Sequence, residues 1–106
     1  GQGSDRATAL GYVNLLRQRA FGNDSGNIQD GEMTPDFILD ERARELYWEC
    51  TRRTDLIRYD KFTTANYLWQ WKGGVKAGAA VNSKYNVYPI PTTDLTANPN
   101  LYNENY

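Results

Sequence analysis

The chain contains no histidine and only one cysteine, Cys50. Without histidine it lacks the commonest general base near neutral pH and the commonest metal ligand. A lone cysteine cannot close an internal disulfide, and without histidine it has no partner for a Cys–His catalytic pair. We therefore expect Cys50 to be a buried structural thiol, and we predict no catalytic residue, no bound metal and no cofactor.

The sequence also lacks a long apolar run and a marked excess of charge. No stretch approaches the ~20 apolar residues that a membrane-spanning helix needs. The 12 basic and 13 acidic residues give a formal net charge of -1, which offers no electrostatic basis for nucleic acid as a partner. The first residues, Gly1–Ser4, have neither the basic nor the apolar region of a signal peptide, so we expect the chain to begin at a cut end.

Aromatic residues, in contrast, are abundant: the chain has eight Tyr, three Trp and three Phe. Tyr and Trp carry polar atoms, so they often lie where a core meets water or another surface. A chain of 106 residues with 40% hydrophobic residues is long enough for one domain and too short for two.

Local signals predict two helices in the first part of the chain. Ser4 is a candidate N-cap, and Gly22 should end the helix that follows it. Thr34 and Pro35 open a second helix as N-cap and first-turn proline. The sequence thus predicts a mainly α chain: a helix pair over about 4–21 and 35–60, followed by an irregular tail over 61–106.

Three glutamates of the second predicted helix, Glu41, Glu45 and Glu49, recur every four residues and so share one face. A glycosidase needs two carboxyl groups that face each other across a bond, about 5–9 Å apart. Here every glutamate has an arginine within helical reach, which favours ion pairs. We interpret this face as structural rather than catalytic, and we do not predict an enzyme.

The loop over residues 23–32 contains several side chains whose oxygen atoms calcium would accept. Their spacing does not match the Asp-x-Asp/Asn-x-Asp/Asn-Gly pattern of an EF-hand. Asn, Asp, Ser and Gly are equally typical of tight turns. A turn is the favoured interpretation, and calcium binding at this loop stays open.

An aromatic row at Tyr67, Trp69 and Trp71 is the sharpest local candidate for ligand binding. In an extended chain these three rings would share one face, and a flat row of rings suits the apolar faces of sugars. In a helix only Tyr67 and Trp71 would align. Packing is the competing interpretation, because large aromatic residues occur more often in cores and interfaces than in ligand platforms.

Residues 38–58 read I-L-D-E-R-A-R-E-L-Y-W-E-C-T-R-R-T-D-L-I-R. This run resembles the signature helix near the C-terminus of the SusD/RagB family, glycan-capturing lipoproteins of the Bacteroidetes outer membrane. The family pattern is roughly I-L-x-E-R-A-R-E-L-x-x-E-G-x-R-R-x-D-L-I-R, so Cys50 stands where the family often has glycine. Its charged positions form the structural signature: Glu41, Arg42, Arg44, Glu45, Arg52, Arg53, Asp55 and Arg58.

Two further blocks carry the resemblance. Residues 11–20, G-Y-V-N-L-L-R-Q-R-A, are similar to the family's Y-(I/L)-N-x-(V/L)-R-x-R-A helix, and Tyr88–Pro91 is similar to its P-I-P element. Residues 67–74 also resemble the corresponding stretch of a starch-binding member. The last five residues depart from the family's usual Q-N-P-G-Y ending.

The resemblance implies that this chain is the C-terminal segment of a longer, mainly α protein built on tetratricopeptide-like helix pairs. It would contribute a helix hairpin and an irregular wrap rich in aromatic residues, Pro and Asn. The parent would lie on the surface of the cell outer membrane, lipid-anchored through an N-terminal part outside this sequence.

The resemblance also implies the function: non-enzymatic binding and uptake of oligosaccharide or polysaccharide together with a TonB-dependent, SusC-like outer-membrane transporter. This segment would be mainly scaffold, with the remainder of its own parent chain as a partner. No glycan-contacting residue of the family maps onto it. The alternative is a purely structural interaction module that contacts the transporter and has no ligand of its own.

Overall fold

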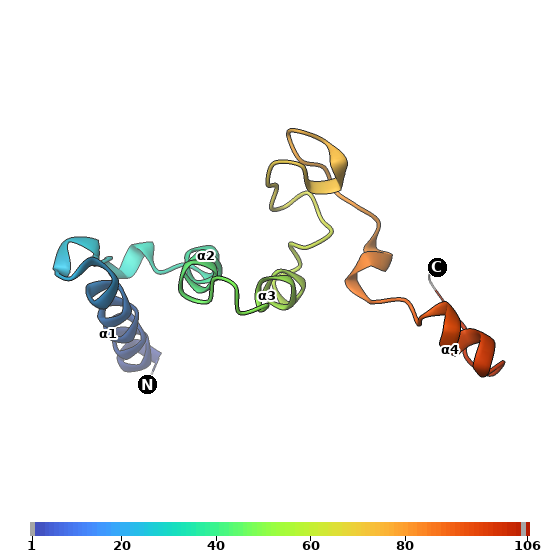
Figure 1. The fold of residues 1–106 in the computed structure, drawn as a ribbon. Coiled ribbons are helices and arrows are strands. Elements are labelled where there is room, and N and C mark those ends of the chain that lie inside the picture. Colours follow the sequence, from blue (N-terminus) through green and yellow to red (C-terminus); the bar gives the residue numbers. More distant parts are fainter. Residues whose placement is uncertain (1, 105) are drawn as a thin grey trace. The chain divides into compact units, whose positions relative to one another are not determined.

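The computed structural model describes residues 2–104 and 106, and among these it contains helices but no strand (Figure 1). This confirms the expected mainly α class. The chain divides into two compact units, Gly1–Tyr47 and Trp48–Tyr106. The first unit contains α1 (Gln2–Phe21), the 3-10 turns η1 (Asp24–Gly26) and η2 (Asp30–Glu32), and α2 (Pro35–Glu45). The second contains α3 (Arg52–Arg58), the turns η3 (Lys72–Gly74) and η4 (Ser83–Asn86), and α4 (Thr92–Ala97).

α1 ends at the predicted glycine but begins earlier than predicted. Gly22 adopts a φ of 73°, a left-handed conformation that glycine reaches without steric cost, and its N–H donates to the Gln18 carbonyl at 2.8 Å. Ser4 lies inside the helix and not at its cap, because α1 already begins at Gln2. Neither Gln2 nor Gly3 stops a helix outright, so the chain continues in helical conformation ahead of Ser4.

The segment over residues 22–34 runs back along α1 and is fixed to it by polar side chains. Asn14 holds Ile28 through two bonds: its amide donates to the Ile28 carbonyl at 3.1 Å, and its Oδ1 accepts the Ile28 N–H at 2.8 Å. Near the start of α1, Arg6 binds the Asp30 carboxylate at 2.6 Å. Later residues of the segment therefore pair with earlier residues of α1, so the segment returns toward the beginning of the helix.

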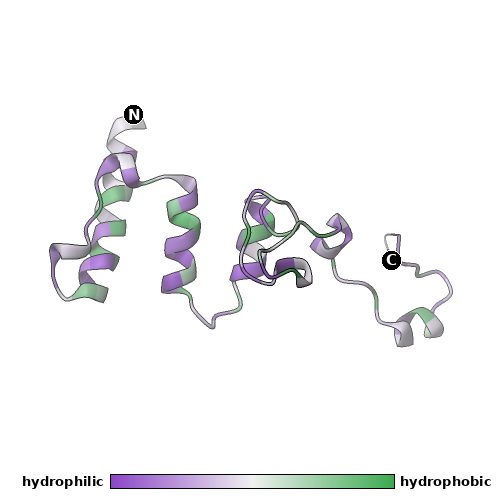
Figure 2. Ribbon diagram, turned by 90° about the horizontal axis from the view of Figure 1, so that it is seen from above, coloured by the Kyte–Doolittle hydropathy of each residue, from purple (hydrophilic) through white to green (hydrophobic). Residues whose placement is uncertain are grey.

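α2 consequently runs in the same direction as α1, and the two helices lie side by side in Figure 2. Arg17 pairs with Glu41 at 2.8 Å, and two residues further on Arg19 pairs with Glu45. The helix hairpin that the resemblance implies is not formed by these two helices, because they run in the same direction. The connecting segment over residues 22–34 allows this direction, because it is long enough to run back along a helix of ~30 Å before the second helix starts.

The second predicted helix, 35–60, is interrupted. It begins as predicted, with the Thr34 Oγ1 accepting the Phe37 N–H at 3.1 Å and Pro35 in the first turn. It ends at Glu45, because Trp48 and Cys50 adopt left-handed φ values of 67° and 59°. A new helix, α3, starts only at Arg52. The break also corrects the expected burial of Cys50, which is exposed in the structure.

Replacing Cys50 by glycine should stabilise this turn. A left-handed conformation costs a residue with a Cβ about 1–2 kcal/mol, whereas glycine loses about 0.5–1 kcal/mol more chain entropy on folding. We therefore expect Cys50→Gly to raise the free energy of unfolding by roughly 0.5–1 kcal/mol in chemical denaturation. The control is Thr51→Gly, at a φ of -89°, which should be destabilising. If Cys50→Gly leaves the free energy of unfolding unchanged or lowers it, the left-handed conformation of Cys50 is not strained.

The chain beyond α3 contains only short helical turns among the described residues. Tyr85 and Asn86 lie within the 3-10 turn η4, and the following Val87 is extended, with a φ of -115° and a ψ of 154°. Asp94 lies in the first turn of α4, whose cap position is Pro91. No helix among residues 2–104 and 106 has the length and apolar character needed to cross a bilayer.

The hydrophobic core is small, and many large apolar side chains remain exposed. In the first unit the buried apolar residues are Ile28, Met33 and Leu39, and in the second Leu56 is buried. Exposed side chains include Tyr12, Leu15 and Phe21 of α1, Trp48, Trp71, Tyr88 and Tyr102.

Candidate functional site

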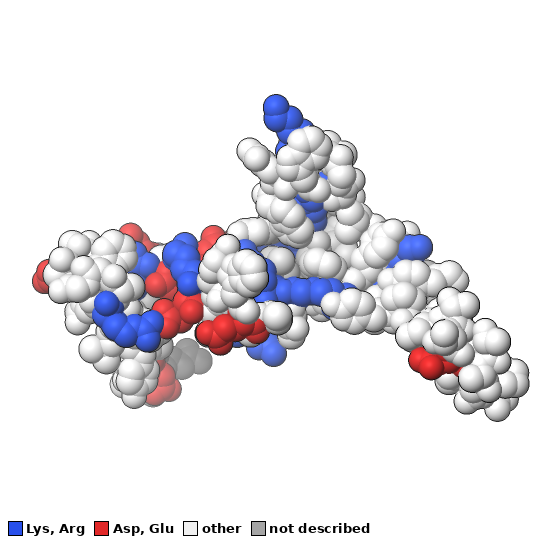
Figure 3. Space-filling model, viewed as in Figure 1, with Lys and Arg blue, Asp and Glu red and all other residues white. Residues whose placement is uncertain are grey.

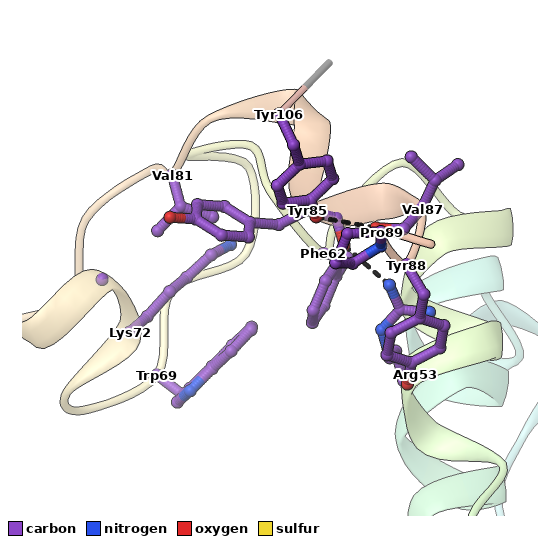
Figure 4. A pocket seen from close by; sticks show the side chains of 11 residues that line it. Arg53, Phe62, Trp69, Lys72, Val81, Tyr85, Val87, Tyr88, Pro89 and Tyr106 are labelled. Atoms are coloured by element: carbon purple, nitrogen blue, oxygen red, sulfur yellow. Dashed lines mark hydrogen bonds between the residues drawn. The ribbon is translucent and has the colours of Figure 1, made fainter. Parts of the chain in front are cut away.

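The second unit encloses a hollow of about 520 Å³ whose wall is almost wholly apolar (Figure 4). Five aromatic rings contribute to it, together with two cations and no carboxylate. Its lining residues are Arg53, Phe62, Trp69, Lys72, Gly73, Val81, Tyr85, Val87, Tyr88, Pro89 and Tyr106.

Arg53 of α3 connects the signature run to the Tyr88–Pro91 block. Its guanidinium lies 3.9 Å from the ring centroid of Tyr88 and 5.0 Å from that of Phe62. Its Nη2 donates to the Tyr85 carbonyl at 2.7 Å. The cation is therefore enclosed by rings and held by a hydrogen bond, an arrangement that binds two distant parts of the chain together.

Tyr106, the last residue, closes one side of the hollow. Its hydroxyl lies 2.9 Å from the Val87 carbonyl oxygen and 3.1 Å from that of Lys84, and it can donate its proton to either. Its ring meets that of Tyr85 edge-on, with the centroids 6.4 Å apart (Figure 4). The tail thus packs on the same hollow as α3, although its sequence departs from the family pattern.

Lys72 is only 3% exposed, and sequence reasoning did not single it out. Its ammonium donates to the carbonyl oxygens of Lys61 (2.9 Å), Thr64 (2.5 Å) and Tyr67 (2.7 Å). The ammonium also lies 4.6 Å from the centroid of the Trp69 ring. Burial lowers the pKa of Lys72 below its ordinary value. This lysine is the centre of the loop over residues 61–81.

Backbone bonds complete this loop. The Val81 N–H donates to the Thr63 carbonyl at 2.8 Å, and the Ala79 N–H donates to the Lys72 carbonyl at 3.0 Å. Gly78 has a φ of 83°, and a Cβ there would lie 2.5 Å from the Trp69 carbonyl oxygen. Only glycine fits this close approach, so the loop depends on it to close.

The three predicted ligand-binding residues have different surroundings. The Tyr67 hydroxyl accepts a hydrogen bond from Arg52 at 2.8 Å, Trp69 lines the hollow, and Trp71 is 64% exposed. The chain here is not a strand, and Trp71 has a left-handed φ of 68°. The rings of Tyr67 and Trp69 are tilted by 52° with their centroids 6.4 Å apart, so they do not form a flat row. Glycan contact at these residues stays a prediction.

The signature residues of the first unit form a network of ion pairs. Glu41 accepts hydrogen bonds from Arg17 (2.8 Å) and Arg44 (2.6 Å), and the side chains of Arg17 and Glu41 are only 15% and 14% exposed. Arg17 also lies over the rings of Phe21 and Phe37. Two sequence blocks that resemble the family therefore pair with each other.

The remaining signature residues divide between buried and exposed positions. Arg42 and Glu45 line a second hollow, of about 290 Å³, between α1 and α2. In the second unit Asp55 is buried, and Arg58 is exposed. A structural role for the signature stays a prediction.

The loop over 23–32 is built from turns. The Asn23 side chain accepts the Ser25 N–H at 2.8 Å, and Glu32 accepts the Gln29 N–H at 2.8 Å. Among the described residues there is no group of three or more His, Cys, Asp or Glu side chains that could hold a metal ion.

The fold and these contacts define a mainly helical chain whose second unit contains a hollow lined by aromatic rings. The sequence model of the SusD family matches residues 2–106, and the chain belongs to this family. The Starch-binding protein SusD of Bacteroides thetaiotaomicron is 47% identical to it over 99% of this chain, and a SusD-like protein of Formosa agariphila is 35% identical over 90%. The chain spans 18% of the length of each of these relatives.

Proposed function

We propose that this chain is the C-terminal segment of a surface-exposed, lipid-anchored outer-membrane protein. The parent binds oligosaccharide or polysaccharide without cleaving it and passes it to a TonB-dependent, SusC-like transporter. The observation that carries this proposal is the 47% identity, along almost the whole chain, to a protein named for starch binding. Tetratricopeptide-like helix pairs would form the rest of the parent's scaffold.

The exposed apolar side chains support a mainly scaffolding role for this segment. Tyr12 and Leu15 are three residues apart on α1 and both point to solvent, so they form an uncovered apolar stripe. A stripe of this kind on a 20-residue helix is typical of a surface that packs on further helices. The remainder of the parent chain is the proposed occupant.

A second candidate is a structural module that contacts the transporter and has no ligand of its own. The aromatic hollow supports it, because a sugar needs hydrogen-bonding groups, whereas the exposed wall of this cavity is almost wholly apolar and Arg53, Lys72 and Tyr106 already bond within the chain. In addition, Glu41, Arg53 and Tyr67 already have partners within the chain.

Calorimetric titration of a malto-oligosaccharide into the full-length protein and, in parallel, into this chain tests the proposal. We expect binding heat from the full-length protein and none from the short chain, which would leave this segment as scaffold. Heat from the short chain would place a sugar site in it, with Tyr67, Trp69 and Trp71 as first candidates. Silence from both would reject starch-derived ligands, and release of reducing sugar would contradict the non-enzymatic function.

A further inference from the structure

Charge is segregated along this chain by residue type and by sign. All four lysines lie between residues 61 and 84, whereas every arginine lies between residues 6 and 58. No Asp or Glu occurs from residue 61 to residue 93. We name residues 61–84 the lysine loop. Its local charge is positive even though the formal net charge of the whole chain is only -1.

The lysine loop holds an exposed indole, and an exposed lysine lies across the same turn of the backbone. Trp71 is 64% exposed, and its left-handed backbone is fixed by two bonds: its N–H donates to the Lys76 carbonyl at 3.4 Å, and its carbonyl accepts the Gly74 N–H at 3.0 Å. The first bond places Lys76, which is exposed, directly across the turn from Trp71. On the face shown in Figure 3, the part of the second unit that this loop forms carries blue and white atoms and no red ones.

The turn that carries Trp71 is strained, since Trp71 has a left-handed φ of 68°, and this points to a use. A left-handed Trp is costly, and such a residue persists only where the surrounding structure determines it. Here two backbone bonds hold Trp71 itself, and the next residue, Lys72, holds the loop together from inside through three carbonyl bonds. The exposed indole gains no burial in return for this strain. A preorganised ring loses little entropy when a ligand stacks on it.

We propose that the lysine loop is a docking surface for a negatively charged glycan, one that carries carboxylate or sulfate groups. The apolar face of a sugar ring would stack on Trp71, and the Lys76 ammonium would pair with an acidic substituent of the same or the next sugar. Since the loop has no acidic residue, nothing in it repels such a chain. This inference rests on the proposed function, because it assumes that the full-length protein binds glycans.

The test uses the full-length protein in affinity electrophoresis and calorimetry with polygalacturonate, a sulfated galactan and neutral starch. We expect binding to at least one acidic polymer that weakens as salt rises. Trp71→Ala should raise the dissociation constant about tenfold and Lys76→Gln about fivefold. Gln70→Ala, in the same turn, and Arg58→Gln, which removes an exposed cation outside the loop, are the matched controls and should change it little. Circular dichroism should show all four variants folded.

Failure of the inference and failure of the proposed function give different results. Binding to starch without binding to either acidic polymer would overturn the docking surface and leave the proposed function standing. Binding of an acidic glycan that neither Trp71→Ala nor Lys76→Gln weakens would likewise overturn the docking surface and leave the proposed function standing. If these variants instead weaken only the complex with the transporter, the loop contacts a protein and the inference is wrong. Absence of binding to all three polymers would count against both.

Discussion

Replacing Lys72 by methionine should strongly destabilise the lysine loop. Methionine has a similar length but no donor, so the carbonyl oxygens of Lys61, Thr64 and Tyr67 would lose their shared partner inside a buried site. An unsatisfied buried acceptor costs about 1–3 kcal/mol, so we expect a total loss of about 3 kcal/mol or more. Hydrogen exchange in the full-length protein can measure this loss of stability. The Ala79 and Val81 N–H groups form the bonds that close the loop, so they should exchange faster when the loop is destabilised.

Lys76→Met is the matched control for this prediction. Lys76 is exposed, and only its backbone carbonyl accepts a bond from the loop, so the same substitution there should leave exchange at Ala79 and Val81 nearly unchanged. Equal protection in Lys72→Met and wild type would show that the three carbonyl bonds contribute no net stability. A loss of the same size in both variants would show a general charge effect rather than a local one.

Replacing Glu41 by glutamine should destabilise the first unit by about 2–3 kcal/mol, somewhat less than the 3–5 kcal/mol typical of a fully buried broken pair. The neutral amide would leave Arg17 without its anionic partner in a largely buried position. Arg17 also donates to the Gly26 carbonyl, so its displacement should loosen the segment that retraces α1. Chemical denaturation and hydrogen exchange over residues 22–34 measure the two effects.

Glu45→Gln provides a graded comparison within the same helix. Its partner Arg19 is 66% exposed, so this pair lies largely in water and should contribute no more than about 1 kcal/mol. Equal losses in the two variants would contradict the argument that burial decides the difference. A negligible effect of Glu41→Gln would show that Arg44 and solvent compensate for the lost charge.

Sequence reasoning was most successful where a structure depends on a few neighbouring residues. The cap at Thr34, the first-turn Pro35 and the stop at Gly22 follow from backbone bonds within one or two helical turns. The resemblance of residues 38–58 to the family signature is also a local property of the chain. These signals were sufficient for the mainly α class and for the family.

The break between α2 and α3 was not predictable in the same way. Residues 46–51 contain neither Gly nor Pro, and the charged pattern continues through them without a change of period. The left-handed Trp48 and Cys50 therefore reflect conformational strain that no propensity scale favours. The family pattern has glycine at the position of Cys50, and this was the one available signal of the break.

By itself, then, the sequence determined the end of α1 at Gly22, the start of α2 at Thr34 and Pro35, and the family that the chain resembles. The tertiary structure alone decided that α2 runs in the same direction as α1, because the connecting segment is long enough for either direction. It also decided the surroundings of Lys72 and Arg53, whose partners are 5 to 11 and 9 to 35 residues away in the chain. Burial of a cation depends on such distant groups meeting in space, and no local pattern of residues records that meeting.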